Sequence, residues 1–152
     1  MQFNDPAISA AQKMEFSDSV ATVMSKSVVV ANESHNFSSV LELFSQHGMH
    51  HLPIVDGGNK LVGIVSSNDL MKVFIDPKYK TVSLNSEEAN QVVSISDIMT
   101  QNPVTIAPND TIKAASKIFA ERGFRVLPVV ENGEIVGILS VKDIIHSIAY
   151  FS

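Results

Sequence analysis

Two short segments of the chain place a hydroxyl and a carboxylate three residues apart, Ser66 with Asp69 and Ser140 with Asp143. Each pair stands where an apolar stretch gives way to a helical pattern. At a helix start such a pair forms a capping box, in which the serine accepts the N3 amide hydrogen, worth about 1 kcal/mol per cap. The same groups suit a ligand, because first-turn amides bind phosphate and a carboxylate accepts two hydrogen bonds from a ribose diol. The two interpretations are compatible.

The two pairs belong to an internal repeat that spans most of the chain. Residues 49–70 return as residues 124–144, with the shared patterns L-P-[IV]-V and V-G-I-[VL]-S-x-x-D. The first copy carries one extra residue around 57–60, as is typical of a surface turn. A repeat of this kind is usually one supersecondary unit with an uncovered apolar face, so we expect the two copies to pack as one pseudo-symmetric module.

Each copy is predicted to be a β-α-β-β-α unit, which makes the fold class α/β (α+β). Apolar opening turns at 20–24 and 95–99 precede β-branched strands at 28–30 and 104–106. Apolar residues then recur with helical spacing, and each helix has a candidate N-cap and a glycine suited to a left-handed C-cap. The apolar positions are Phe37, Val40, Leu41, Phe44, Ile112, Ala115 and Phe119, the caps Asn36 and Asp110, and the glycines Gly48 and Gly123.

Two apolar strands and a last helix complete each copy. The strands are joined by turns rich in glycine and asparagine, which are typical of hairpins, and they are apolar on both faces, so helices should cover them. The predicted strands are 52–55, 61–65, 127–130 and 135–139, and the predicted last helices are 68–74 and 141–150.

The remaining residues flank or join the two copies. Asp5 and Pro6 indicate the capped start of a helix, so residues 1–17 are expected to form an N-terminal helical extension. The first domain is predicted at 18–75 and the second at 95–152. Residues 76–94 are polar and turn-rich and are expected to form a connector with some helix near its C-terminal end.

These features together resemble a tandem pair of cystathionine β-synthase (CBS) domains, the regulatory arrangement called a Bateman module. The resemblance rests on the opening turns that end in Met24 and Met99 and on the two copies of both quoted patterns. It covers residues 18–152 apart from the connector. It implies a stand-alone regulatory protein whose clefts bind adenosine nucleotides or related adenosyl ligands, and whose chains form a flat homodimer.

The resemblance also implies which residues bind the ligand. The serine and aspartate of each second pattern would hold phosphate and ribose, and residues around each L-P pair would enclose the adenine. By position, these residues are Thr105, Arg125, Val126, Leu127, Pro128, Ser140, Lys142 and Asp143 in the second copy, and His50, His51, Leu52, Pro53, Ser66, Asn68 and Asp69 in the first. Val30 stands where the second copy has Thr105, so the first copy lacks that hydroxyl.

Positive charge favours the second copy as the site for a charged nucleotide. Arg125 aligns with His50 and could reach a phosphate, although an arginine there could equally be a solvated surface group. Lys142 adds a second cation, whereas Asn68 at the corresponding place supplies none. The two prolines of the L-P pairs also have a structural interpretation, because a strand start tolerates a missing amide hydrogen.

Composition excludes several classes of function. The net charge of −5 and pI near 5.4 argue against nucleic acid or an anionic membrane as partner. Without cysteine the chain has no disulfide, thiolate nucleophile or Cys-based metal site. No catalytic motif, signal peptide or membrane span is recognisable, so we expect a cytoplasmic protein that is no enzyme and needs no cofactor. His47, His50 and His51 are not expected to share a metal, because neighbours in a strand point to opposite faces.

Three hypotheses follow, of which the first is preferred. The chain senses AMP, ADP, ATP or a related adenosyl ligand and signals to a protein partner in trans. Alternatively it is a ligand-free structural or dimerisation module. A third hypothesis is divalent-cation sensing through Glu42, Asp56 and Glu131. The apolar residues expected between repeats or subunits of a homodimer are Met71, Val73, Phe74, Ile144, Ile145 and Ile148.

Overall fold

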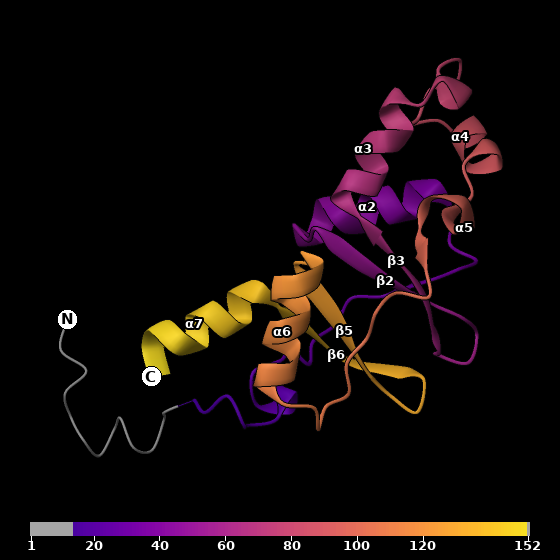
Figure 1. Cartoon of the computed structure of the whole chain (residues 1–152). Coiled ribbons are helices and arrows are strands. Elements are labelled where there is room, and N and C mark those ends of the chain that lie inside the picture. Colours follow the sequence, from indigo (N-terminus) through magenta and orange to yellow (C-terminus); the bar gives the residue numbers. More distant parts are fainter. Residues whose placement is uncertain (1–13, 152) are drawn as a thin grey trace. The chain divides into compact units, whose positions relative to one another are not determined.

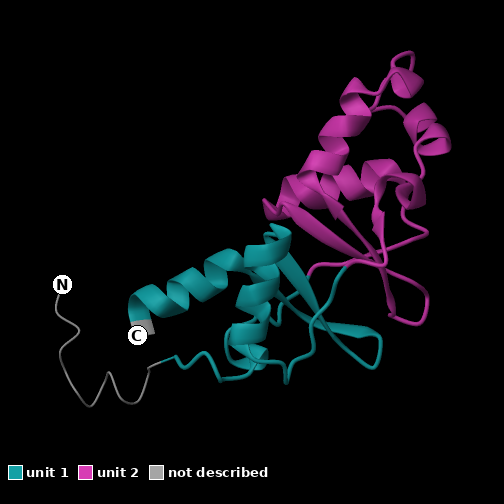
Figure 2. Cartoon of the chain, in the orientation of Figure 1, with its two compact units in different colours: residues 1–28, 104–152 teal, residues 29–103 magenta. Residues whose placement is uncertain are grey.

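The computed structural model describes residues 14–151, with the side chain of Phe151 excepted, and confirms the α+β fold class. The chain forms two compact units (Figure 2). Unit 1 comprises residues 1–28 and 104–152, and unit 2 comprises residues 29–103. The expected N-terminal helix falls almost entirely outside the described residues. Of its residues, Met14 is buried in the core of unit 1 without being helical.

Unit 2 contains a four-stranded sheet with the order β1-β2-β3-β4. Its two middle strands, β2 and β3, are labelled in Figure 1. Its strands are β1 (Ala31–Asn32), β2 (His51–Val55), β3 (Leu61–Ser66) and β4 (Thr100–Gln101). β1 runs parallel to β2, and the other pairs are antiparallel. The hairpin of β2 and β3 therefore forms as predicted, and the strand that follows the second opening turn joins its outer edge.

The helices of unit 2 are α2 (Phe37–His47), α3 (Ser67–Ile75), the 3-10 turn η2 (Pro77–Tyr79), α4 (Glu87–Val92) and α5 (Ile95–Ile98). α2 begins and ends as its sequence predicts. Asn36 accepts the amide hydrogen of Ser39 at 2.9 Å, and Gly48 closes the helix in the left-handed region at φ 59°. The fully buried Phe37 and Val40 face Leu52, Ile54 and Val65 in one apolar core.

The connector is part of this core. Tyr79, Ala89 and Val93 are buried in the same cluster as the hairpin. Asn90 of α4 accepts the amide hydrogen of Ser38 at 2.8 Å and donates to the Ser38 hydroxyl at 3.0 Å. The segment between the repeats is thus fixed to the first one, and the expected helix near its end is α4.

Unit 1 is built on the hairpin of β5 (Val126–Glu131) and β6 (Glu134–Ser140), with α6 (Ile112–Arg122), α7 (Val141–Phe151) and the 3-10 turn η1 (Val20–Thr22). Its hairpin turn has Asn132 at φ 54° and Gly133 at φ 80°. Positive φ at both central residues is the geometry of a type I′ turn, which matches the twist of the strands. The first repeat has a longer turn at this place, where its extra residue lies.

The opening turn of each sequence repeat packs in the unit that contains the hairpin of the other repeat. Val20, from the start of the first repeat, is fully buried in the core of unit 1, whereas Ile95, from the second, is buried in unit 2. A glycine makes room for each turn: a Cβ on Gly137 would lie 2.6 Å from the sulfur of Met24, and one on Gly63 would overlap the sulfur of Met99. The domain boundaries 18–75 and 95–152 stay a prediction for the repeats, because the compact units divide the chain elsewhere.

Two local predictions are wrong. The first strand of each copy is not at 28–30 or 104–106: pairing begins at Ala31 in one copy, and in the other only Ile106 forms a bridge, to Val129. The N-cap of α6 is Thr111, whose hydroxyl accepts the amide hydrogen of Ala114 at 3.0 Å. Asp110 is unavailable as a cap because its carboxylate closes the preceding turn on the amide of Ala107 at 2.8 Å. Of the helices in the described residues, none has the length and apolar character needed to cross a membrane.

Candidate functional site

Both Ser-x-x-Asp pairs form complete capping boxes. At α3 the Ser66 hydroxyl accepts the Asp69 amide hydrogen at 3.1 Å, and Asp69 Oδ2 accepts the Ser66 amide hydrogen at 2.8 Å. At α7 the corresponding distances for Ser140 and Asp143 are 3.0 and 2.9 Å. The structural interpretation of the pairs is therefore confirmed in both copies. Each aspartate is held in one orientation at the junction of strand and helix.

Capping leaves half of each carboxylate available. Only Oδ2 of Asp69 and of Asp143 accepts the capping hydrogen bond, and Oδ1 has no hydrogen-bond partner within residues 14–151. An ionised carboxylate has about four acceptor positions, so the cap occupies a minority of them. Both side chains are half-buried rather than enclosed. Each site thus offers an oriented acceptor that a diol could bridge.

In unit 1, the fold brings most of the predicted second-copy residues to the start of α7. The strand register pairs Val126 with Ser140, and the Val141 amide donates to the Arg125 carbonyl at 3.0 Å. Arg125 is exposed beside this junction, and Lys142 is exposed in the first helical turn. Two cations therefore stand at the same helix start as Asp143.

The remaining predicted residues of unit 1 lie one strand position further along. Leu127 and Pro128 are fully buried, so their side chains belong to the core and only their backbone could face a ligand. The Ile106 amide donates to the Pro128 carbonyl at 3.1 Å, which brings the neighbouring, exposed Thr105 to this strand.

Unit 2 repeats this arrangement with fewer charges. His51 pairs with Ser66 across the hairpin, and the Ser67 amide donates to the His50 carbonyl at 2.8 Å. His50 and Asn68 are exposed where unit 1 has Arg125 and Lys142. Leu52 and Pro53 are fully buried, like their counterparts, and Val30 is half-buried at the position of Thr105.

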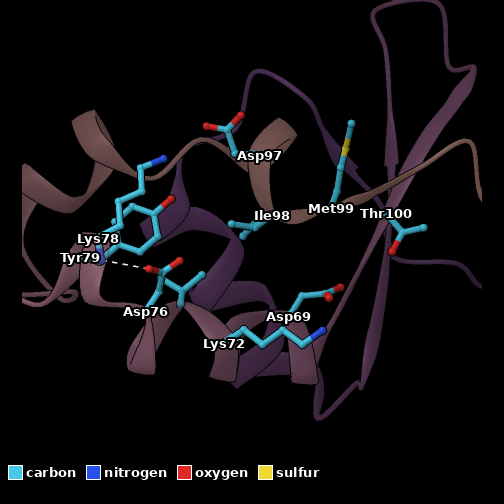
Figure 3. A pocket seen from close by; sticks show the side chains of 10 residues that line it. Asp69, Lys72, Asp76, Lys78, Tyr79, Asp97, Ile98, Met99 and Thr100 are labelled. Atoms are coloured by element: carbon cyan, nitrogen blue, oxygen red, sulfur yellow. Dashed lines mark hydrogen bonds between the residues drawn. The ribbon is translucent and has the colours of Figure 1, made fainter.

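A groove in unit 2 was not anticipated from the sequence (Figure 3). It has a volume of about 420 Å³ and runs between one face of α3 and the segment of η2 and α5. Asp69 and Lys72 of α3 line this groove together with Asp76, which caps the end of that helix, with Lys78 and Tyr79 of η2, and with Asp97 of α5. The spacing of Asp69, Lys72 and Asp76 along one helical face was the available signal. The rest of the lining comes from η2 of the connector and from α5 and the start of β4, whose positions beside α3 the sequence does not indicate.

Metal ligands are not gathered in the part of the chain that the structure describes: no group of three His, Asp or Glu side chains there could hold an ion. The three acids of the cation hypothesis lie on separate elements, Glu42 on α2, Asp56 in the β2–β3 turn and Glu131 at the end of β5. Asp56 Oδ1 already accepts the amide hydrogens of Gly58 and Lys60, at 2.8 and 3.0 Å.

The last helix of each copy presents apolar side chains to solvent. On α3 these are Met71, Phe74 and Ile75, with 51%, 45% and 81% of their surface exposed, and on α7 they are Ile145, Ile148 and Tyr150, with 59%, 42% and 51%. Two of the residues expected at an interface, Val73 and Ile144, are instead buried within their own units. Exposure of this extent on two helices is typical of surfaces that bind a partner.

Comparison with known proteins identifies both repeats. The family model of the CBS domain matches residues 20–76 and 95–150. Among curated proteins, the chain is 26% identical over 126 residues to the uncharacterized protein MJ1225 of Methanocaldococcus jannaschii, which corresponds to 83% of this chain and 41% of that protein. The chain spans less than half the length of the first curated relatives it matches.

Solved structures with this fold include CBS pairs that hold adenosine compounds. CBSX2, a CBS-pair protein from Arabidopsis thaliana, in complex with AMP is 25% identical, with a TM-score of 0.72 and coverage of 86% of this chain and 95% of that one. The CBS domain pair of protein MJ0100, in complex with 5′-methylthioadenosine and S-adenosyl-L-methionine, is 26% identical, with a TM-score of 0.68 and coverage of 84% and 97%.

Proposed function

The chain belongs to the CBS domain family, and from that premise we propose that it is a regulatory, non-catalytic module that binds an adenosine nucleotide or a related adenosyl ligand. The observation that carries this proposal is the pair of oriented carboxylates. Asp69 and Asp143 each keep Oδ1 available beside the hydroxyl and amides of a helix start. The solved relatives with AMP, 5′-methylthioadenosine and S-adenosylmethionine support the choice of ligand class.

In this proposal each aspartate accepts hydrogen bonds from the ribose diol of a ligand. Ser140 and Ser66 keep a hydroxyl hydrogen to donate to the ligand, since capping uses the serine oxygen only as an acceptor. The backbone of the strand starts, at 126–128 and 51–53, borders the adenine. The hydrogen bonds to the ionised aspartate are charge-assisted and therefore stronger than neutral ones. They can hold the ribose at an open surface without an enclosed cavity.

Phosphates are assigned to the cations of unit 1. Arg125 presents a planar guanidinium that can bind a phosphate with two hydrogen bonds, and Lys142 adds a point charge at the same helix start. Thr105 supplies a further hydroxyl. In unit 2, the positions of Arg125 and Lys142 hold His50 and Asn68 instead of an arginine and a lysine. We therefore assign AMP, ADP or ATP to the second copy in preference to the first.

The regulatory effect follows from a difference in affinity. A ligand that binds one arrangement of the protein more tightly than another shifts the population toward it by the ratio of the two affinities. We propose that the partner that senses this shift is a separate protein, and that the chain is a homodimer through the exposed apolar faces of α3 and α7.

The second candidate function is a ligand-free dimerisation module. The observation that favours it is the same apolar surface on α3 and α7, which does not depend on any ligand. Light scattering at micromolar concentration tests the dimer: a dimeric mass that becomes monomeric in Ile145→Lys supports the interface, and a monomeric wild type removes it. A dimer without any nucleotide response would favour this second function.

A thermal-shift panel tests ligand binding directly. The ligands are AMP, ADP, ATP, S-adenosylmethionine, GTP and magnesium, applied to the wild type, Asp143→Ala and Asp69→Ala. A ligand at a hundredfold excess over Kd adds about 2.7 kcal/mol, which raises Tm by roughly 5 to 10 °C in a chain of this size. We expect the rise with adenosine ligands, and its loss for phosphorylated ligands in Asp143→Ala.

The matched control is Thr111→Ala. It removes the cap of α6 in the same unit, so it lowers Tm by a similar amount without touching the proposed site. It should keep the full ligand-induced rise. A rise that persists in Asp143→Ala and Asp69→Ala, or the absence of any rise in the wild type, would contradict the proposed function.

A further inference from the structure

The last helix of unit 1, α7, extends beyond the apolar core of its unit (Figure 1). Ile144 is buried in that core, and beyond it only Ser147 is buried among the described side chains of α7. The outer face of α7, which we define as Ile145, Ile148 and Tyr150, is apolar and roughly half-exposed. Exposed apolar surface is unfavourable in water, so we expect this face to have an occupant.

The first described residues of the chain are fixed in the same unit. Met14 is buried in the apolar cluster that also contains Ile144 of α7. The amide of Lys113, in the first turn of α6, donates to the Phe16 carbonyl at 2.9 Å. α6 in turn packs against α7 (Figure 1). Residues 1–13 are therefore joined to unit 1 at the cluster to which α7 contributes.

We propose that residues 1–13 of the same chain cover the outer face of α7. In the sequence, Ile8, Ala11 and Met14 recur at the spacing of one helical face. This row ends at Met14, whose side chain is already buried in the core of unit 1. The contact would bury apolar residues of the segment and of α7 together. The inference goes beyond the proposed function and does not depend on it.

The length of the segment matches the outer face of α7. Ile8 precedes Met14 by six residues, and Tyr150 follows Ile144 by six residues. In helical geometry both stretches have a rise of roughly 9 Å. A helical segment that leaves Met14 at the level of Ile144 and runs along α7 therefore brings Ile8 to the level of Tyr150. The exposed apolar residues of α7 all lie within this stretch.

The area of the outer face favours a tethered occupant over a separate molecule. Its three side chains present on the order of 300 Å² of accessible surface. Each side of a standard protein–protein interface buries about 800 Å². A segment joined to the same chain has an effective concentration on the order of millimolar. It can therefore occupy a surface that is too small to hold a second chain at micromolar concentration.

The contact has a consequence for the homodimer proposed above. That dimer uses the apolar faces of both α3 and α7, so the second chain has to displace residues 1–13 from α7. Of the two helices, α3 belongs to unit 2 and α7 to unit 1, to which the segment is joined. The segment therefore competes with dimerisation at α7 and leaves the face of α3 available.

A nitroxide spin label on the full chain tests this contact by NMR. The sequence has no cysteine, so Ser9→Cys supplies a single site for the label, at a polar position outside the row of Ile8 and Ala11. The ¹⁵N-labelled chain also carries Phe74→Lys, which removes the apolar face of α3 from the dimer surface. We expect the strongest loss of amide intensity on residues 148–150, and a weaker loss toward the start of α7.

Two further substitutions remove the contact, one from each side. Ile8→Asp in the segment and Ile148→Lys on α7 should each abolish the loss of intensity on residues 148–150. Gln12→Glu adds the same charge to a polar position of the segment, and Val92→Lys changes a partly exposed valine on α4 of unit 2. Both controls should keep the loss. The amide spectrum of each variant also shows directly whether unit 1 remains folded.

A mixture of spin-labelled chain without ¹⁵N and ¹⁵N-labelled chain without a spin label shows which chain supplies the segment. The strongest loss of intensity in this mixture would assign the cover to a second chain and overturn the proposed contact. A loss confined to residues 14–18 and α6, or an equal loss in Ile8→Asp, would overturn it as well. None of these results bears on the adenosine site, which the ligand-induced rise in Tm tests separately.

Discussion

Units 1 and 2 contain the same capping box in different electrostatic surroundings. The hydrogen bonds of Ser140 with Asp143 and of Ser66 with Asp69 agree to within 0.1 Å. Around them, unit 1 has Arg125 and Lys142, whereas unit 2 has uncharged Asn68 and a histidine. The capping box is thus present in both copies, and in the proposed function the neighbouring side chains set the charge of the ligand that each copy prefers.

The connector adds a second difference. In unit 2 it contributes Lys78 and Tyr79 to a groove beside Asp69. A duplicated fold can therefore acquire distinct ligand preferences from the residues that join its copies. Three pairs of matched substitutions, one in each unit, sharpen or break this comparison, and they follow from the largest expected effect to the smallest.

The largest effect on stability is expected at the glycines where an opening turn packs against a hairpin. This effect should be the same in the two units. Gly137→Val places a side chain against the sulfur of Met24 and 3.0 Å from the Ser25 carbonyl oxygen, and it should reduce the free energy of unfolding by about 2 to 3 kcal/mol. Gly63→Val should do the same at Met99 and Thr100. Chemical denaturation measures both.

Gly57→Val is the control for these two variants. Nothing lies within 4 Å of a Cβ at Gly57, so its free energy of unfolding should change by less than about 0.5 kcal/mol. A large loss of stability for only one of Gly63→Val and Gly137→Val would show that the packing of an opening turn on the hairpin stabilises only one unit.

The next effect concerns charge and should differ between the units. Arg125→Met is expected to weaken ATP binding about tenfold, the equivalent of 1.4 kcal/mol, because it removes a charge-assisted contact to phosphate. His50→Met should change ATP binding less than about twofold. Titration with ATP and with adenosine measures the contrast, and adenosine affinity should be unaffected by either variant. Equal losses in the two variants would contradict the assignment of phosphates to unit 1.

The smallest expected effect is the loss of stability when a capping serine is removed, and it should be equal in both units. Ser140→Ala and Ser66→Ala each remove one half of a capping box and should each lower stability by about 1 kcal/mol, or Tm by roughly 2 to 4 °C. Calorimetric melting of the two variants without ligand checks this. A loss confined to one copy would mean that one of the boxes contributes nothing to its helix.

Short sequence patterns correctly predicted the helix caps and hairpins that position the site. The Ser-x-x-Asp pairs, the Asn36 cap and the left-handed Gly48 and Gly123 are all decided by contacts within four residues, and all of them form as their sequence indicates. The hairpins follow from apolar runs separated by turn residues in the same way. Such features need no knowledge of distant parts of the chain.

The failures arose where distant segments compete. Thr111 and Asp110 are both good caps, and the choice between them depends on Asp110 closing a turn with Ala107. The polar sequence of the connector did not indicate that Tyr79 is buried in the core of unit 2. The sequences of the opening turns did not indicate that each turn packs against the hairpin of the other repeat. The groove of unit 2 was missed for the same reason, because one of its walls is the connector.

The most direct test of the central claim is an amide NMR titration of the full chain with AMP. The account predicts that the largest shifts fall on the amides of residues 140–143, Val126 and Leu127, where the α7 helix start meets β5, and that Asp143→Asn removes them. Saturating AMP that leaves these amides unmoved, or moves them equally in the variant, would contradict the claim that the Ser-x-x-Asp motif is a nucleotide site.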